Sequence, residues 1–259
     1  MKQAILVVSF GTSYLDTLKK NIQAIEQEIA QTLPDYCCRR AFTSGVIMKK
    51  LHERDNIQID NVAEALTRLV QDGFTKVILQ PTHVMNGEEY DKLCRLAAPF
   101  QAQLQLTIGT PLLTSVEDYL DTAKALMASI AEPVSDEAVI FMGHGTPHFA
   151  NAAYALMEYV LHDLGWEQAY VATVEGYPEL HHVMVKLQKQ PQIKRVRLHP
   201  FMVVAGDHAK NDMAGDDGDS WRSQLEQAGY EVTCVLQGLG EYASIRRLFA
   251  KHALEATQK

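Results

Sequence analysis

Two histidines and one glutamate in the second half of the chain have side chains that bind transition metals. Each follows a different apolar stretch: AVIFMG precedes His144, AYVATV precedes Glu175, and RLHPFMVVAGD precedes His208. Two imidazoles and a carboxylate suit a borderline divalent ion such as Co²⁺, Ni²⁺, Fe²⁺ or Zn²⁺. A lone histidine after a strand is more often an ordinary polar residue near a helix start, so the prediction depends on the three together. No compact motif such as H-E-x-x-H supports it.

These residues belong to a chain in which apolar and amphipathic segments alternate. The apolar stretches, which we expect to be buried strands, are residues 4–10, 38–44, 76–84, 104–112, 138–145, 169–175, 195–204 and 231–239. Segments with helical periodicity lie at residues 15–33, 62–72, 88–100, 116–131, 150–164, 179–189, 220–228 and 242–256. This alternation predicts an α/β protein, with parallel sheets covered by helices on both faces. Ligands of such sheets bind beyond the carboxyl ends of the strands, where the three candidate ligands lie.

The two halves of the sequence align with each other around the candidate ligands. KVILQPTHVMNGEEYDKL aligns without gaps with RVRLHPFMVVAGDHAKND, LVVSFGTS with IFMGHGTP, and AFTSG with ATVEG. Each candidate ligand aligns with a residue of the first half: His144 with Phe10, Glu175 with Ser44, and His208 with Glu89, at offsets of 134, 131 and 119 residues. The alignment predicts two similar three-layer α/β domains. We place them at residues 1–132 and 133–259, joined near the helix-breaking segment 131–136, and the final helix could pack back on the first domain.

The composition limits the partners of the protein. The 259 residues are 47% hydrophobic and 22% charged, and the formal net charge is −8. An acidic chain without clustered lysine and arginine argues against nucleic acid and against an anionic membrane surface. The apolar run in the N-terminal sequence MKQAILVVSFGTS is too short for a signal peptide, and no apolar stretch approaches a membrane span. We therefore expect a cytoplasmic protein, in which the four cysteines are reduced.

Six motifs resemble the anaerobic sirohydrochlorin cobaltochelatases of cobalamin biosynthesis, which are class II chelatases. They are LVVSFGTS, AFTSG, HVMNGEEY, FMGHGTPHFANAAY, VEGYPE and, most specifically, AGDHAKNDMAGDDGDSW. The resemblance covers nearly the whole chain. It implies a chelatase-like fold with an internal pseudo-twofold and a cleft between the domains. It also implies insertion of Co²⁺ into the anionic tetrapyrrole sirohydrochlorin without ATP or an organic cofactor, with precorrin-2 as an alternative substrate.

The resemblance further implies roles for individual residues. His144, Glu175 and His208 are expected to bind the metal, and imidazole can also accept a proton near neutral pH. We therefore assign His144 as a catalytic proton acceptor, assisted by Glu89 from the opposite wall of the cleft. The macrocycle carries eight carboxylates, for which N–H and hydroxyl groups at a helix start are suitable partners. The residues expected to contact it are Phe10, Gly11, Thr12, Ser13, Ser44 and His83.

Other functions stay open at this point. Nickel or iron insertion into the same macrocycle is an alternative, because the ligand types do not separate these ions from cobalt. A non-catalytic tetrapyrrole- or metal-binding protein would use the same residues without turnover. A binding protein for transport fits less well, because no signal peptide is expected. A homo-oligomer is compatible with the sequence, and the acids that follow His208, at positions 212, 216, 217 and 219, have no assigned role.

Overall fold

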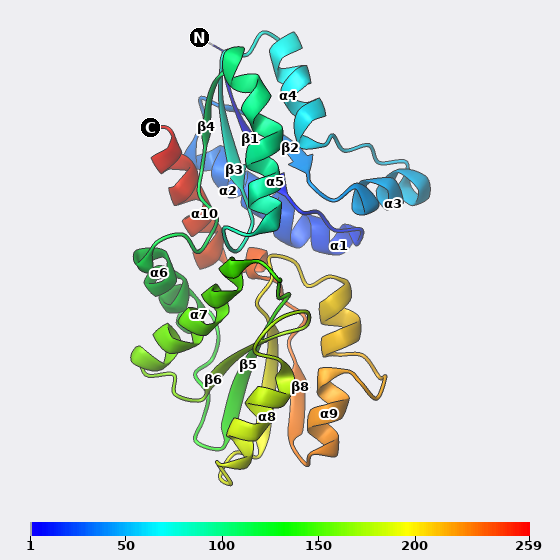
Figure 1. The fold of residues 1–259 in the computed structure, drawn as a ribbon, viewed down its shortest axis with the longest axis vertical. Helices are drawn as coiled ribbons and strands as arrows, with labels where there is room; N and C mark the ends of the chain where they lie inside the picture. The colour runs from blue at the N-terminus through cyan, green and yellow to red at the C-terminus, as the bar shows by residue number, and fades with distance from the viewer. Residues whose placement is uncertain (1) are drawn as a thin grey trace. The chain divides into compact units, whose positions relative to one another are not determined.

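The computed structural model describes residues 2–259, which divide into two compact units, each with a four-stranded parallel sheet (Figure 1). The first unit runs to Thr114 and includes Ile245–Lys259, and the second unit is Ser115–Ser244. This division differs from the predicted boundary between residues 132 and 133. Helix α6 (Val116–Met127) groups with the second unit because it packs against α7 (Ala152–Asp163).

The sheet of the first unit has the strand order β2-β1-β3-β4. Its strands are β1 (Gln3–Ser9), β2 (Cys37–Phe42), β3 (Lys76–Pro81) and β4 (Gln105–Ile108). The central strands β1 and β3 are buried along nearly their whole length. They read as continuous apolar runs because helices cover both faces of the sheet.

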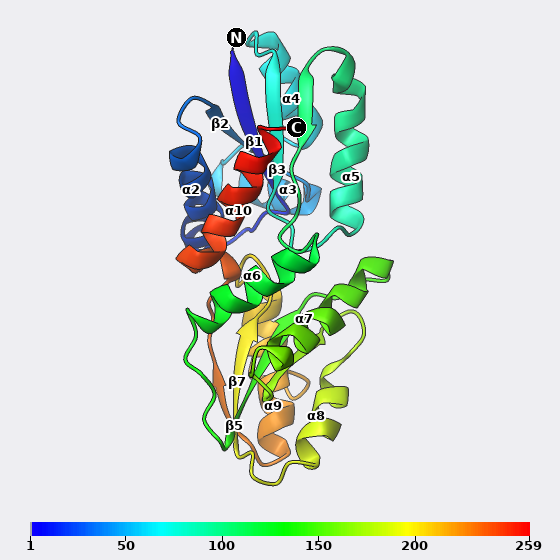
Figure 2. The same ribbon diagram turned by 90° about the vertical axis from the view of Figure 1, so that its left-hand side faces the viewer.

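Helices cover the two faces of this first sheet (Figures 1 and 2). On one face lie α4 (Val62–Gln71) and α5 (Glu88–Ala97), whose leucines share a core with the strands. On the other face lie α2 (Ala24–Thr32) and α10 (Ala243–Ala256). The remaining helical segments of this unit are α1 (Leu15–Thr17), η1 (Leu18–Gln23), α3 (Gly45–Asp55) and η2 (Ala98–Ala102). Three of them are short, and α3 buries only Leu51.

The sheet of the second unit has the order β6-β5-β7-β8. Its strands are β5 (Glu137–Gly143), β6 (Ala169–Thr173), β7 (Arg195–Pro200) and β8 (Glu231–Cys234). Helices α8 (Leu180–Gln188) and α9 (Trp221–Gln227) pack on one face in a shared apolar core, and α7 contacts β6. Short segments complete the unit: η3 (Phe149–Asn151), η4 (Ala209–Met213) and η5 (Leu239–Glu241).

The two sheets repeat the same pairing register. Ile5 pairs with Cys38 in the first sheet, and their counterparts at offsets of 134 and 131 residues, Val139 and Ala169, pair in the second. The pairing of β1 with β3 is likewise repeated by β5 and β7 at offsets of 134 and 119 residues. The prediction of two similar α/β domains with parallel sheets is therefore confirmed.

Every predicted strand and helix is present, with ends shifted by a few residues. The helix caps follow the sequence as well. Ser115 begins α6 in a capping box with Asp118, and Ser220 accepts a hydrogen bond from the Ser223 N–H at the start of α9. Within residues 2–259, no helix combines the length and apolar character that a membrane crossing requires.

Candidate metal centre

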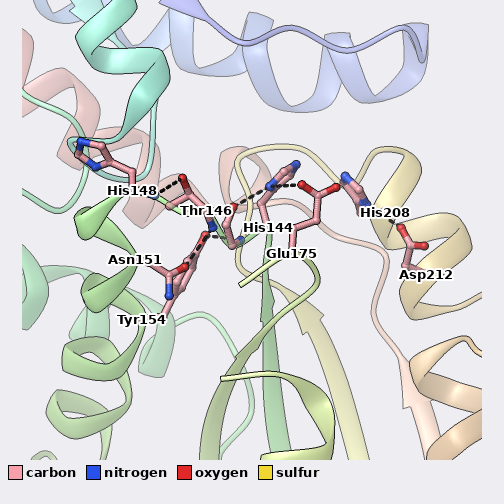
Figure 3. Close-up of polar contacts among 9 residues, drawn as sticks. His144, Thr146, His148, Asn151, Tyr154, Glu175, His208 and Asp212 are labelled. Carbon is pink, nitrogen blue, oxygen red and sulfur yellow. Dashed lines mark hydrogen bonds and ion pairs between the residues drawn. The ribbon is translucent and has the colours of Figure 1, made fainter. Parts of the chain in front are cut away.

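The structure brings His144, Glu175 and His208 together at the carboxyl end of the second sheet (Figure 3). His144 follows β5, Glu175 follows β6, and His208 lies between β7 and η4. Each side chain offers one ligand atom, and these atoms lie within 4.8 Å of one another. Within residues 2–259 this is the one group of three or more potential ligands that meets that spacing.

The distances are close to those needed to share one ion. The Nδ1 atom of His144 lies 3.9 Å from the Oε2 atom of Glu175, and the rings of His144 and His208 are 4.7 Å apart and nearly perpendicular. Two atoms that each lie about 2.1 Å from one ion are at most about 4.2 Å apart. The side chains are 48%, 59% and 30% exposed for His144, Glu175 and His208, so an ion can reach them from solvent.

Glycines allow the turns that carry His144 and Glu175 to approach each other. Gly145 has a φ of +87°, a conformation that residues with a side chain rarely adopt. A Cβ atom added to Gly145 would lie 2.4 Å from the backbone nitrogen of Gly176. Glu175 also donates its backbone N–H to the carbonyl of His144 at 2.8 Å. The two ligand-bearing turns are therefore in direct backbone contact.

Hydrogen bonds orient both imidazoles. The Nδ1 atom of His208 is 2.6 Å from the Oδ2 atom of Asp212, and the Nδ1 atom of His144 is 2.9 Å from the carbonyl oxygen of Gly145. A proton on the Nδ1 atom of His208 satisfies the Asp212 carboxylate and leaves its Nε2 atom free to bind a metal. The Nδ1 atom of His144 lies near both the Gly145 carbonyl and the Glu175 carboxylate. Sequence reasoning left Asp212 without a role, although its i,i+4 spacing from His208 was a usable signal.

Among the other acids after His208, Asp216 contributes its carboxylate to the loop before α9, and Asp217 and Asp219 contribute backbone carbonyls. Asp216 forms an ion pair with Arg222, the carbonyl of Asp217 accepts the N–H of Ser220, and the carbonyl of Asp219 accepts the side-chain amide of Gln224. These contacts precede and brace α9. The ion pair gives Asp216 a structural role that is separate from the metal centre, whereas these contacts do not require acidic side chains at positions 217 and 219.

In the first unit, Glu89 lies in a polar cluster at the carboxyl end of the sheet. It occupies the first turn of α5, where its Oε1 atom is 3.5 Å from the Nζ atom of Lys92, and Lys92 donates to the carbonyl of Thr43 at 2.7 Å. The Oε2 atom of Glu89, the Oγ1 atom of Thr43 and both ring nitrogens of His83 are buried, and no hydrogen-bond partner for them lies within residues 2–259. Such atoms are costly to leave unsatisfied and suit a bound polar group.

Burial keeps the imidazole of His83 neutral. It lowers the pKa of His83 to about 4, the charge of Glu89 opposes this shift, and the charge of Lys92 adds to it. At neutral pH His83 can therefore donate and accept hydrogen bonds, but it is a weak proton acceptor.

The other predicted substrate contacts differ in exposure. Phe10 is 48% exposed at the end of β1. Gly11, with a φ of +107°, turns the chain next to the ring of Phe42. The polar members of the set, Thr12, Ser13 and Ser44, are buried, and the Ser44 hydroxyl accepts the N–H of Ile47 as the cap of α3.

A surface pocket of about 500 Å³ lies away from these residues, along the edge strand β2. Three arginines line it, but Arg40 pairs with Glu26 and Arg68 pairs with Asp60, while Arg39 is exposed. No predicted site residue lines this pocket. The candidate functional site is therefore the cluster of His144, Glu175 and His208.

Comparisons of this chain with known sequences and structures agree with the resemblance that its motifs indicated. The sequence profile of a family described as "Cobalt chelatase (CbiK)" matches residues 3–258. A sirohydrochlorin cobaltochelatase of Salmonella typhimurium is 44% identical, over 99% of this chain and 97% of that protein. The sirohydrochlorin cobaltochelatase CbiKC of Nitratidesulfovibrio vulgaris is 32% identical, over 98% and 90% of the two chains. The structure of SirB from Bacillus subtilis with Fe³⁺ has a TM-score of 0.67, with 13% identity and coverage of 99% and 96%, which is a likeness of fold.

Proposed function

The chain belongs to the cobalt chelatase family, as its motifs predicted, and we propose that it inserts Co²⁺ into sirohydrochlorin without ATP. The convergence of His144, Glu175 and His208 from three separate loops is the observation that carries the proposal. Relatives of nearly full length that are named for this reaction support it.

The ligand set suits an ion that must be bound and then released. Insertion exchanges one dication for the two pyrrole N–H protons of the macrocycle, so the protein must loosen the hydration of the ion and accept two protons. Two neutral imidazoles and one carboxylate hold Co²⁺ less tightly than a thiolate cage would. We assign metal binding to His144, Glu175 and His208, with the Nε2 atom of His208 facing the ion because its Nδ1 atom is bonded to Asp212.

We assign the two proton acceptors to different units of the chain. His144 accepts one pyrrole proton as the ion leaves its ring nitrogen. Glu89 accepts the other, and its Oε1 atom lies 3.5 Å from the Nζ atom of Lys92. His83 contacts the substrate as a neutral imidazole, because its low pKa makes it a poor base. Phe10 offers an exposed ring for stacking, and residues 11–13 and Ser44 shape the turn around it.

The direct test is insertion of Co²⁺ into purified sirohydrochlorin in the absence of ATP, followed by the absorbance change of the macrocycle. Wild type is expected to turn over many times, and His144→Ala and His208→Ala to lose most activity while remaining folded. If both folded variants insert cobalt at wild-type rates, the assignment is wrong. Fewer than one turnover per chain would instead indicate a binding protein.

Parallel assays define the substrates. Ni²⁺ and Fe²⁺ are offered with sirohydrochlorin, and precorrin-2 is offered with Co²⁺. We expect the highest kcat/KM for Co²⁺ and sirohydrochlorin. A higher value for nickel or iron would reassign the metal without changing the ligand set.

A further inference from the structure

Asn151 connects the two turns that carry His144 and Glu175. Figure 3 shows its contact with Thr146 in the first of these turns. Its Oδ1 atom accepts the backbone N–H of Thr146 at 3.1 Å, and its Nδ2 atom donates to the carbonyl of Tyr177 at 2.5 Å. One side-chain amide thus bridges two segments, each at a position two residues beyond a proposed metal ligand.

The position of Asn151 in the helix makes this bridge notable. Asn151 is the last residue of η3 and immediately precedes α7, with helical backbone angles (φ −56°, ψ −25°). The cap at the start of η3 comes from His148, whose ring accepts the N–H of Ala150, and the Asn151 side chain makes no cap bond. Its hydrogen-bonding capacity is directed instead to the two loops.

Backbone hydrogen bonds also join these turns, but they do not reach the residues that Asn151 contacts. The β5–β6 ladder ends with the pair Gly143 and Thr173, and beyond it one backbone bond joins Val174 to Gly143 and another joins Glu175 to His144. The side chains of both ligands are about half exposed, so packing restrains them weakly. The same bridge also occupies the space beside Gly176, where an added Cβ atom would lie 2.6 Å from the Asn151 Oδ1 atom.

Tyr154, one helical turn further along α7, contacts the turn that carries His144. Its hydroxyl oxygen accepts the N–H of Gly145 at 3.2 Å, and its ring lies against Gly143, where an added Cβ atom would be 2.2 Å away. Tyr154 contacts the His144 turn, whereas Asn151 contacts both turns. Asn151 is therefore the side chain that can couple the positions of the two ligands.

We propose that Asn151 is a positioning residue that sets the distance between His144 and Glu175 and so sets the affinity for the metal substrate. This inference rests on the proposed metal site. Both functions of the amide are needed, since an acceptor faces Thr146 and a donor faces Tyr177. Asn151→Asp keeps the acceptor but places a carboxylate against a carbonyl, and Asn151→Ala removes both contacts.

The experiment measures Co²⁺ binding to the purified chain without macrocycle, by calorimetry and by the visible absorption of bound Co²⁺, which reports ligand geometry. Groups that orient metal ligands typically change affinity by 10- to 100-fold. We expect both Asn151 variants to bind Co²⁺ about 10- to 100-fold more weakly, with an altered absorption spectrum. The KM for Co²⁺ should rise by a similar factor, whereas the Kd for sirohydrochlorin should not change.

Gln168→Ala is the matched control. Its side-chain amide donates to the carbonyl of Ser135 at 3.1 Å and so also bridges two loops, but at the amino end of the same sheet. It should leave the Kd for Co²⁺ and the absorption spectrum unchanged. Circular dichroism and Tm identify any variant that fails to fold, and Asn151→Asp, the smaller change, then decides.

The outcomes separate the two proposals. If wild type binds Co²⁺ and His144→Ala weakens binding, but folded Asn151→Asp and Asn151→Ala bind with wild-type Kd and spectrum, the positioning role is refuted and the metal site stands. If wild type does not bind Co²⁺, or His144→Ala leaves binding unchanged, the metal site fails and the role of Asn151 fails with it.

Discussion

In both units the chain leaves the first central strand through a glycine with a positive φ, Gly11 after β1 and Gly145 after β5. The residue before the glycine then accepts a backbone hydrogen bond from the turn that follows the neighbouring strand. Ser44 donates to Phe10 at 3.2 Å, and Glu175 donates to His144 at 2.8 Å. The same backbone thus presents a phenyl ring and a hydroxyl in one unit, and an imidazole and a carboxylate in the other.

The third pair of counterparts also shares a backbone hydrogen bond, in this case within a single segment. Asp91 donates its N–H to the carbonyl of Gly87 before Glu89, and Lys210 donates to the carbonyl of Gly206 before His208, at 3.0 and 3.1 Å. Backbone hydrogen bonds fix where these side chains begin, and the side chains alone decide what the position can bind. A duplicated scaffold can therefore carry a candidate metal centre in one copy and, as we propose, a substrate-facing surface in the other.

Replacing a metal ligand of the second unit with the residue type of its counterpart in the first unit should cause the largest loss of activity. His144→Phe keeps an aromatic ring at the turn but removes both a metal ligand and the proposed proton acceptor. General acid–base catalysis alone contributes about 10²- to 10⁴-fold, so we expect a loss of at least about 1,000-fold in kcat/KM for Co²⁺ insertion. Steady-state assays with sirohydrochlorin measure it.

His181→Phe is the matched control for this exchange. His181 is an exposed histidine of the same unit that pairs with Glu179 at 3.4 Å and has no proposed role. Its activity should stay within about twofold of wild type, as is usual for surface substitutions. Equal losses in the two variants would show that the exchange acts through general damage rather than through the metal ligand.

The comparison also shows how far the sequence could predict the structure. The strands were visible because residues such as Ile5 and Val139 are buried on sheets covered on both faces, which leaves an uninterrupted apolar run. The convergence of His144, Glu175 and His208 followed from the rule that ligands lie at the carboxyl ends of parallel strands. Both inferences use patterns that are local to each strand.

What the sequence could not predict depends on contacts between distant segments. Asn151 acts on Tyr177, 26 residues away, and no spacing rule relates the two. Helix α6 shows an apolar face, but that pattern does not say which sheet the helix belongs to. Helix α3 was not predicted because only Leu51 of its residues is buried, so it lacks an apolar stripe.

A second exchange of counterparts concerns stability rather than catalysis. Gln80 and His199 occupy equivalent buried positions before the prolines that end β3 and β7. Burial lowers the pKa of His199 to about 4, and the charge of Arg197 adds to the shift. Between pH 6.5 and 4 the unfolded chain therefore binds more protons at this histidine than the folded chain, so folding stability falls as the pH falls.

The full effect of His199 is about 3 kcal/mol in the free energy of unfolding, reached below pH 4. His199→Gln should remove this part of the pH dependence. Urea unfolding of wild type and variant at pH 7 and at pH 5 measures it, and the stability difference should shift in favour of the variant at pH 5. A parallel decline in both proteins would mean that His199 does not contribute. The pKa of His83 is also lowered to about 4, but His83 is present in both proteins, so its contribution cancels in the stability difference.

Asp212 should matter less than the ligand that it orients. Asp212→Asn replaces the carboxylate 2.6 Å from the Nδ1 atom of His208 with an amide of the same size. We expect the affinity for Co²⁺ to fall about 10- to 100-fold, because the imidazole becomes less basic and less firmly oriented. Calorimetric titration with Co²⁺ measures this affinity. Asp216→Asn, which breaks the ion pair with Arg222, is the matched control from the same loop and should leave the affinity unchanged. Equal affinities for wild type and Asp212→Asn would remove Asp212 from the metal centre.

The smallest expected effect lies in the first unit, at the counterpart of His144. Phe10 is 48% exposed, and an aromatic contact adds about 0.5–1.5 kcal/mol to binding, so Phe10→Ala should weaken sirohydrochlorin binding about 2- to 10-fold. The affinity for Co²⁺ should not change, because a phenyl ring is not a ligand. Fluorescence titration with sirohydrochlorin and calorimetry with Co²⁺ separate the two quantities. Leu15→Ala, which removes an apolar side chain of 45% exposure from the same unit, is the matched control and should alter neither. If Phe10→Ala lowered the affinity for Co²⁺ as much as His144→Phe does, the two turns would not differ in chemistry as proposed, and the metal centre could not be assigned to the second unit alone.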